Sequence, residues 1–208
     1  MDETAIANKK NIDLNTRIFV HVQNLVTMGQ KNIIITTVDT DVIVIAISCF
    51  ENLASLGLKE LWIAFGSGIN KRWIPIHALS NALGTRTKGF LFWYAFIGCD
   101  TVSAFGVRGK KTAWEAWNIL SEFNSVFTEY SLYKHVRDLS DHDIKLLEKF
   151  TCILYERCTV FESVNECLRG LFTKHGRQVE SIPLTKDALL LHIKRAIYQA
   201  IVWHQATP

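Results

Sequence analysis

The chain has 208 residues, of which 49% are hydrophobic and three are proline, so it is long and apolar enough for one sizeable core rather than a disordered protein. Its formal net charge of +3 is compatible with nucleic acid as a partner without requiring one. The five cysteines include no CxxC pair, the N-terminus is too polar for a signal peptide, and no apolar run approaches the roughly 20 residues of a membrane helix. We expect a soluble, reduced, intracellular protein.

The first half of the chain alternates between helical and strand-like segments. Residues 16–28 carry apolar side chains at helical spacing and end at Gly29, a typical residue beyond a helix C-terminus. Residues 32–38 form a β-branched run without alternation, which predicts a strand buried on both faces of a parallel sheet. Residues 42–56 predict a crossover helix, and residues 61–65 and 72–76 predict two further strands.

Helices dominate the second half. Helical patterns cover residues 77–83, 90–97, 112–123, 140–155, 163–175 and 185–203. The order of segments predicts an α/β fold in which a mostly parallel sheet is flanked by helices and followed by a helical C-terminal region. We expect these parts to form one globular unit.

Two carboxylates follow the first predicted strand. Asp39 and Asp41 stand at its carboxyl end, where ligands gather in parallel α/β sheets. Two acids one residue apart can bind one hard cation such as Mg²⁺, and a pair of such ions activates water for phosphodiester cleavage. The alternative is structural, with Asp41 capping the next helix and Asp39 making turn hydrogen bonds.

A second segment, GCDTVSAFGVRGKKTAW, places Asp100 ahead of a turn rich in Gly and basic residues. Such a turn between two helices exposes backbone N–H groups to a phosphate, and charged side chains strengthen that contact. The candidate nucleic-acid-binding residues are Arg108, Gly109, Lys110 and Lys111. The alternative is a corner between helices that carries a solvated basic face.

In order and spacing, these segments resemble the flap endonuclease branch of the PIN-like nucleases. Gly98, Asp100, Gly109, Lys111 and Ala113 match its pattern, although Val107 stands where the first Gly of the usual Gly-x-Gly is found. TTVDTDVIVIAI and FIGCDTVSAFGVRGKKTAWEAW look closest to transposon-associated PIN-like proteins of animal genomes. The resemblance implies a partial PIN-like domain of Rossmann-like topology over residues 1–97, a helix-turn-helix element over 98–123, and a helical region of the same unit over 124–208.

The resemblance also implies a set of metal ligands. Asp39, Asp41 and Asp100 correspond to ligands and catalytic residues for Mg²⁺ or Mn²⁺, with Asp13 in support. Asn15 stands where the family has a second acid, so a negative charge is missing from the site. The family's first metal-binding strand has no counterpart, which leaves an exposed sheet edge through which chains can associate.

Other conspicuous residues carry a structural and a functional interpretation. His21 and His77 are expected as packed, hydrogen-bonded side chains rather than ligands. Trp114 and Trp117 fit a core more than a base-stacking platform, and the cysteines fit small buried residues more than nucleophiles. His192, Lys194 and Arg195 form a basic helix edge that is either solvated or in contact with a phosphate backbone.

Three classes of function remain open at this level. The first is a degenerate or truncated PIN-like domain that binds nucleic acid, branched or duplex DNA above all, with weak or no activity alone. The second is an active Mg²⁺-dependent endonuclease that cuts branched DNA. The third is a structural or interaction remnant of a mobile-element protein. We expect a nuclear location.

Overall fold

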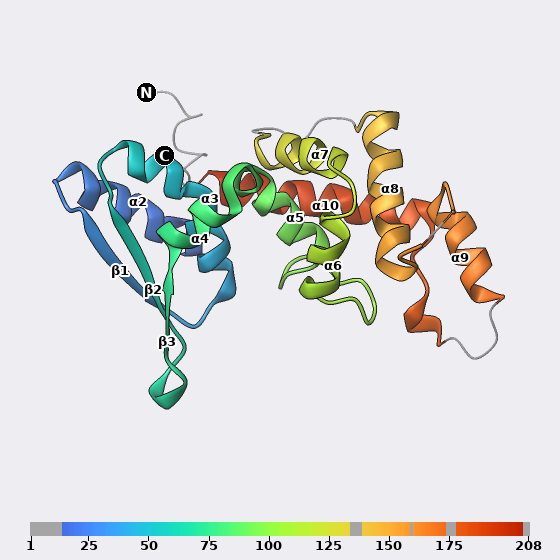
Figure 1. Cartoon of the computed structure of the whole chain (residues 1–208), viewed down its shortest axis with the longest axis horizontal. Coiled ribbons are helices and arrows are strands. Elements are labelled where there is room, and N and C mark those ends of the chain that lie inside the picture. The colour runs from blue at the N-terminus through green and yellow to red at the C-terminus, as the bar shows by residue number, and fades with distance from the viewer. Residues whose placement is uncertain (1–13, 134–138, 159, 174–177, 206–208) are drawn as a thin grey trace, which may run out of the picture. The chain divides into compact units, whose positions relative to one another are not determined.

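The computed structural model describes residues 14–133, 139–158, 160–173 and 178–205 (Figure 1). It shows a mainly helical α/β protein with a small, three-stranded mixed sheet. The chain divides into two compact units. The first contains the described residues up to Leu91 and those from Ile201 onward, and the second contains Phe92–Ala200. The first boundary expected from the sequence, after residue 97, lies inside the second unit.

The first unit contains the sheet and the helices that precede, connect and follow its strands. In chain order these elements are α2 (Leu14–Thr27), β1 (Asn32–Thr37), α3 (Thr40–Ser55), β2 (Glu60–Phe65), the 3₁₀ turn η1 (Gly68–Asn70), β3 (Arg72–Pro75), α4 (Ile76–Leu83) and the 3₁₀ segment η2 (Gly84–Gly89). The predicted helices and strands of this half are all present, with ends that differ by a few residues.

The sheet is mixed rather than mostly parallel. Its strand order is β1-β2-β3, with β1 parallel to β2 and β2 antiparallel to β3. Helix α3 is long enough to return the chain for a parallel neighbour. The turn around η1 between β2 and β3 is too short for a crossover, so β3 runs back along β2. The expectation of a mostly parallel sheet is therefore wrong for the described strands.

Strand β1 is buried on one face only. Ile33 and Ile35 are buried and pair with the buried Leu61 and Ile63 of β2, whereas Ile34 is 60% exposed. The prediction of a strand buried on both faces is wrong, because three successive isoleucines produce an apolar run even when the middle one points away from the core. Alternate residues of β1 and β2 thus face the core of the first unit.

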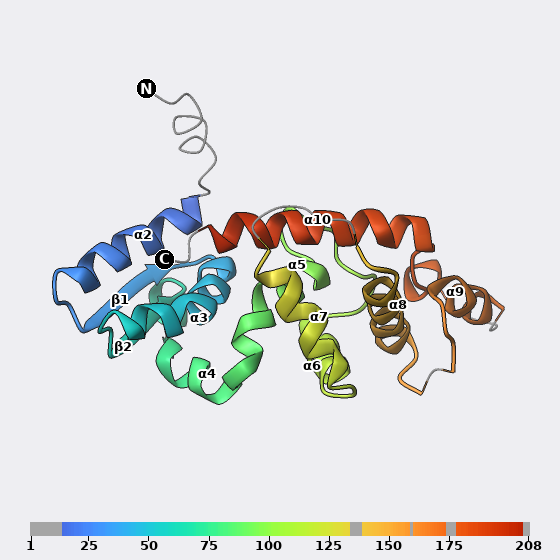
Figure 2. The same cartoon turned by 90° about the horizontal axis from the view of Figure 1, so that it is seen from above.

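The second unit is helical. Its elements are α5 (Phe90–Ile97, of which the first two residues belong to the first unit), α6 (Lys110–Trp117), α7 (Glu122–Ser131), α8 (Asp141–Tyr155), α9 (Val164–Phe172), the 3₁₀ turn η3 (Val179–Ser181) and α10 (Lys186–His204), which enters the first unit at Ile201. Within this unit α10 runs from α9 to α5 (Figure 2), with Lys186 N–H donating to Asn165 Oδ1 at one end and His192 packing on Phe96 further along.

Aromatic side chains form the core of the second unit. The Phe150 ring lies 5.0 Å from that of Phe123 and 5.1 Å from that of Phe127, both edge to face, and Trp117 meets Phe127 at 4.9 Å. Pairs in this geometry contribute about 0.5–1.5 kcal/mol beyond the area that they bury. Trp117 is 1% exposed, which confirms it as a core residue.

The helix predicted over residues 112–123 is two helices. Helix α6 ends at Trp117, and α7 begins at Glu122. Asn118 ends α6 and turns its side-chain amide back to the Trp114 carbonyl at 2.8 Å, while the indole N–H of Trp117 donates to Asn124 Oδ1 at 2.8 Å. These side-chain hydrogen bonds hold a corner that apolar spacing alone does not reveal.

The remaining conspicuous side chains differ in their surroundings. His77 is packed as expected, with Nδ1 3.2 Å from the Leu61 carbonyl and the ring against Trp62. His21 is exposed, contrary to expectation, because it lies on the outer face of α2. Cys49, Cys152 and Cys167 are buried, whereas Cys158 is exposed and Cys99 is half-buried. In the portions of the chain covered by the structure, no helix is long and apolar enough to cross a membrane.

His192 belongs to the interior of the second unit, not to the basic edge predicted for α10. It is 2% exposed; its Nε2 lies 2.7 Å from the Phe96 carbonyl and its Nδ1 3.3 Å from Ser103 Oγ. The carbonyl requires a proton on Nε2, and Nδ1 then accepts from the Ser103 hydroxyl, so the neutral ring satisfies both partners. Burial lowers the pKa of His192, and the positive charge of Arg195 lowers it further, against the raising effect of the Phe96 hydrogen bond.

The pH dependence of stability follows from this environment. The unfolded chain takes up a proton at His192 below about pH 6.5, whereas the folded chain resists it. We therefore expect the free energy of unfolding to fall as the pH drops from 7 towards 5, with a contribution from this residue of at most about 1.4 kcal/mol per pH unit. Urea unfolding of the wild type and of His192→Gln across this range measures the effect. Equal pH slopes in the two proteins would contradict it.

Candidate nucleic-acid interface

The turn between α5 and α6 is built on glycines with distinct roles. Gly98 adopts φ +114°, and a Cβ there would lie 2.6 Å from Ala104 Cα, so no side chain fits. The chain then forms a small bridge between Cys99 and Val102. Gly109, by contrast, adopts φ −88°, which any residue accepts, and a Cβ built on it meets nothing within 4 Å. Gly98 is required by the fold, whereas Gly109 leaves open space at the start of α6.

Val107 has the backbone conformation of a glycine. Its φ is +50°, in the left-handed region that β-branched residues rarely adopt, and its side chain is 65% exposed. The position at which the sequence departs from the Gly-x-Gly pattern thus carries a conformation that favours Gly.

Helix α6 begins without a side-chain cap. Its N-cap residue is Gly109, whose carbonyl accepts the first intrahelical bond from Ala113 N–H at 3.1 Å. The backbone N–H groups of Lys111 and Thr112 precede that bond and have no partner within the helix. Both side chains are exposed. The positive end of the helix dipole and these N–H groups together favour an anion at this point.

Arg108 lies against Tyr155. Its guanidinium is 5.1 Å from the centroid of the Tyr155 ring, and Nη2 donates to the Tyr155 carbonyl at 3.3 Å. Nε is buried and makes no hydrogen bond to any described residue. Burial raises the pKa of Tyr155, with a lowering contribution from Arg108, so the phenol stays neutral beside the guanidinium. Arg108 therefore brings its guanidinium charge to the turn, while Nε is enclosed beside Tyr155.

Lys110 is held by internal contacts. Its ammonium donates to the Gly98 carbonyl and lies 4.0 Å from the centroid of the Tyr94 ring. These contacts tie the start of α6 to the end of α5. Four residues were expected to bind phosphate. Lys111 is exposed, Arg108 is half-buried against Tyr155, Gly109 leaves open space, and Lys110 braces the turn.

A pocket of about 170 Å³ adjoins Arg108 and the first turns of α6. Its polar lining consists of Arg108, Thr112, Glu115 and Arg157, and Tyr155 contributes to the wall. Arg157 Nη2 lies 3.4 Å from Glu115 Oε2, with 64% and 41% of the two side chains exposed. Tyr155 and Arg157 were missed by sequence reasoning, because residues so far along the chain from Arg108 give no local signal.

The acids expected to bind metal lie in different places. Asp100 is exposed in the turn between Cys99 and Val102 of the second unit. Asp39 and Asp41 lie at the carboxyl end of β1 in the first unit and are half-buried. Asp13 falls outside the described residues. Among the residues with defined positions, neither unit contains a group of three or more His, Cys, Asp and Glu side chains arranged to hold a metal ion.

Asp39 is the N-cap of α3, and both of its carboxylate oxygens accept hydrogen bonds. Oδ1 accepts from Asp41 N–H at 2.8 Å, and Oδ2 accepts from Asn15 Nδ2 at 2.7 Å. Its own N–H donates to Thr37 Oγ1 at 3.0 Å. The alternative in which one of these acids caps the helix is therefore confirmed, but the cap was assigned to the wrong acid. Asp39 caps α3, and Asp41 lies in its first turn.

Comparisons with known proteins give no further guidance: no family model, no curated protein and no solved structure matches this chain.

Proposed function

We propose that this chain binds the phosphate backbone of nucleic acid through the start of α6, as a PIN-like domain of the flap endonuclease branch with an incomplete catalytic site. The observation that carries the proposal is the uncapped, open start of α6, where Lys111 and Thr112 are exposed and a Cβ at Gly109 would meet nothing. The packing of the turn would allow a side chain at position 109, so the fold itself does not require a glycine there. The open space beside Gly109 suits an external group that approaches the backbone.

A phosphate at this point is recognised by charge and by N–H donors together. The helix N-terminus supplies backbone donors, Lys111 supplies an exposed charge, and Arg108 supplies the charge of a half-buried guanidinium beside Tyr155. Glu115 opposes an anion, but its pairing with Arg157 reduces that effect. Contacts of this kind position a nucleic-acid strand without reading its sequence, and duplex or branched DNA is the substrate class that the family resemblance favours.

Two features of the fold support the PIN-like interpretation. The parallel pair β1–β2 is joined through α3, and Asp39 follows β1 at the edge of the sheet where such domains bind metal. Val107 adopts the left-handed conformation at the position where the family pattern has Gly. A Rossmann-like topology is part of this proposal and is supported by the parallel pair and its crossover helix.

Asn15 is the reason that we propose weak or absent nuclease activity. In the structure its amide donates to Asp39 Oδ2, so a neutral donor satisfies the carboxylate that the family uses for a cation. This arrangement stabilises Asp39 without metal and adds no negative charge to attract Mg²⁺ or Mn²⁺. An active Mg²⁺-dependent endonuclease is the second candidate, favoured by the position of Asp39 and Asp41 at the end of β1.

DNA binding is expected to depend on Arg108 and Lys111. At low salt, the double variant Arg108→Gln, Lys111→Gln should bind a short DNA duplex about tenfold or more weakly, and the slope of log K against log salt should fall by about 1 for each phosphate that is no longer neutralised. Fluorescence anisotropy with labelled duplex across a salt series measures both quantities.

Lys145→Gln is the matched control, because Lys145 is an exposed lysine on α8 of the same unit. Its effect should be small. Equal losses in the control and the double variant would indicate attraction by net charge alone. The absence of salt-dependent binding in the wild type would leave the structural or interaction role.

A further inference from the structure

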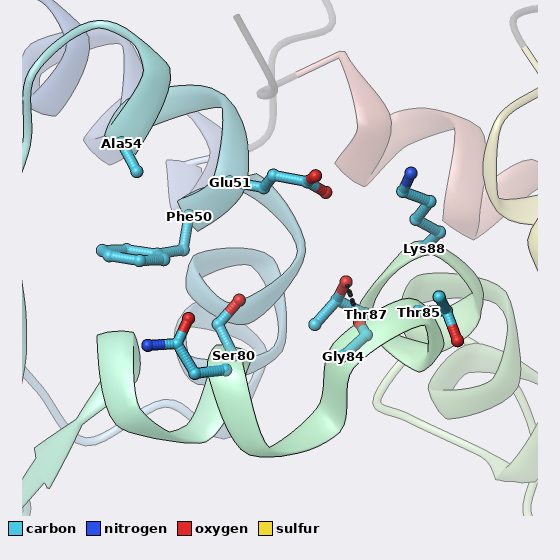
Figure 3. Close-up of a pocket in the computed structure, with 9 residues that line it drawn as sticks. Phe50, Glu51, Ala54, Ser80, Gly84, Thr85, Thr87 and Lys88 are labelled. Atoms are coloured by element: carbon cyan, nitrogen blue, oxygen red, sulfur yellow. Dashed lines mark hydrogen bonds between the residues drawn. The ribbon is translucent and has the colours of Figure 1, made fainter.

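A pocket in the first unit has no part in the proposed nucleic-acid contact. It has a volume of about 440 Å³ and is formed by α3, α4 and η2 (Figure 3). This lies within the range of about 300–1,000 Å³ that is common for small-molecule sites. All of its lining residues belong to the first unit, so its chemistry is independent of the turn before α6.

Opposite charges line this pocket without neutralising each other. Glu51 comes from α3 and Lys88 from η2, and both side chains are exposed. In the described part of the chain neither forms an ion pair, with the other or with a third residue. In Figure 3 the Glu51 side chain extends across the pocket towards η2, and Lys88 lies on the far side. A ligand with a negative group at one end and hydrogen-bond donors further along would match both charges.

Neutral side chains line the rest of the pocket around Glu51. Ser80 is 7% exposed, and no described residue hydrogen-bonds its hydroxyl, which in Figure 3 points up into the pocket. Asn81 is an exposed lining residue. In Figure 3, Phe50 forms an apolar wall at the end away from Lys88. From Lys88 to Phe50 the pocket therefore offers an ammonium, a carboxylate with a hydroxyl, and an aromatic ring, and the Asn81 amide also lines it.

We propose that this pocket binds a phosphorylated sugar carrying a base, a nucleoside 5′-monophosphate. Lys88 takes the phosphate as a point charge. Glu51 accepts hydrogen bonds from the sugar hydroxyls, as an acidic residue does for ribose in dinucleotide-binding folds, and Ser80 adds a hydroxyl partner. The base lies at the Phe50 end, and the Asn81 amide of the lining is a group that both donates and accepts. Free phosphate alone fits poorly, because Glu51 repels it.

Calorimetric titration of the full chain with AMP, adenosine and dAMP tests the assignment. We expect AMP to bind more tightly than either adenosine or dAMP. Lys88→Gln should weaken AMP about tenfold or more, as expected when a charge-assisted hydrogen bond is removed, and leave adenosine unchanged. Glu51→Gln should weaken AMP and adenosine alike and reduce the preference for AMP over dAMP.

Lys59→Gln, which removes an exposed lysine outside the pocket, is the control and should not change AMP binding. No binding of AMP at millimolar concentration, equal loss in Lys88→Gln and Lys59→Gln, or binding of a free amino acid in preference to AMP would each overturn the proposal. The Arg108→Gln, Lys111→Gln variant should bind AMP normally, so failure of this proposal and failure of the DNA-binding proposal are separately visible.

Discussion

Replacement of Gly98 by Ala should lower the free energy of unfolding by about 3 kcal/mol or more, since a strained backbone and an overpacked contact each cost about 1–3 kcal/mol. The backbone at Gly98 has φ +114°, and the new Cβ would lie 2.6 Å from Ala104 Cα and 2.8 Å from Ala104 Cβ. Neither neighbour is the end of a flexible side chain, so the turn itself must move. The Gly98 carbonyl also accepts a hydrogen bond from the Lys110 ammonium. A shift of the Gly98 backbone would break this bond, which holds the start of α6.

Gly109→Ala is the matched control for Gly98→Ala. Gly109 has an ordinary φ of −88° and an open Cβ position, so the loss of a Gly N-cap in favour of Ala should cost no more than about 1 kcal/mol. Urea unfolding followed by circular dichroism separates the two variants. If a phosphate approaches the Gly109 backbone, this control also binds DNA more weakly than the wild type while it remains folded. Equal stability of the two variants would contradict the assigned role of Gly98.

Local signals explain why most helices were predictable. Gly29, with φ +93°, ends α2 where a C-terminal Gly is expected, and its N–H donates to the Val26 carbonyl at 2.9 Å. The starts of α8 and α9 are set by Ser140 and Ser163, whose hydroxyls accept from the N–H groups of Asp143 and Glu166. Each of these helix ends is set by residues within a few positions of one another, so it can be recognised in the sequence.

Features that depend on distant partners were not predictable. The exposed face of β1 depends on which side of the sheet the helices cover, and the sequence of Ile33, Ile34 and Ile35 carries no trace of it. The same holds for His192, whose basic neighbours on α10 suggested a surface position although its partners are Phe96 and Ser103. A helical stripe indicates which face is buried only when polar residues mark the other face.

The candidate interface was located by motif and refined by geometry. The sequence alone singled out Arg108, Gly109, Lys110 and Lys111, but it did not separate the residue that braces the turn from those that remain available. Lys110 is engaged by Gly98 and Tyr94, and Arg108 is oriented by Tyr155. Whether a basic residue of this turn braces the fold or can contact a ligand depends on the aromatic rings that the fold brings beside it.

Asn15→Asp should make the stability of the first unit depend on a divalent cation. Asn15 Nδ2 lies 2.7 Å from Asp39 Oδ2, so the variant exchanges a donor for a second carboxylate at hydrogen-bonding distance. Without metal, loss of the hydrogen bond and repulsion between like charges should lower the free energy of unfolding by about 1–3 kcal/mol. Mn²⁺ neutralises both carboxylates, and a cation present at about 100 times its Kd restores about 2.7 kcal/mol.

The reversed pair Asn15→Asp, Asp39→Asn provides the sharpest control for this prediction. It keeps one donor and one carboxylate, and Asn serves as an N-cap about as well as Asp, so its stability should remain near that of the wild type and should not respond to Mn²⁺. Urea unfolding of the three proteins with and without millimolar Mn²⁺ is the measurement. If Asn15→Asp is destabilised but unaffected by Mn²⁺, Asp39 is a helix cap alone and the metal chemistry implied by the nuclease resemblance is absent. If the wild type itself is stabilised by Mn²⁺, the active endonuclease becomes the better proposal, because Asn15 then does not prevent metal binding.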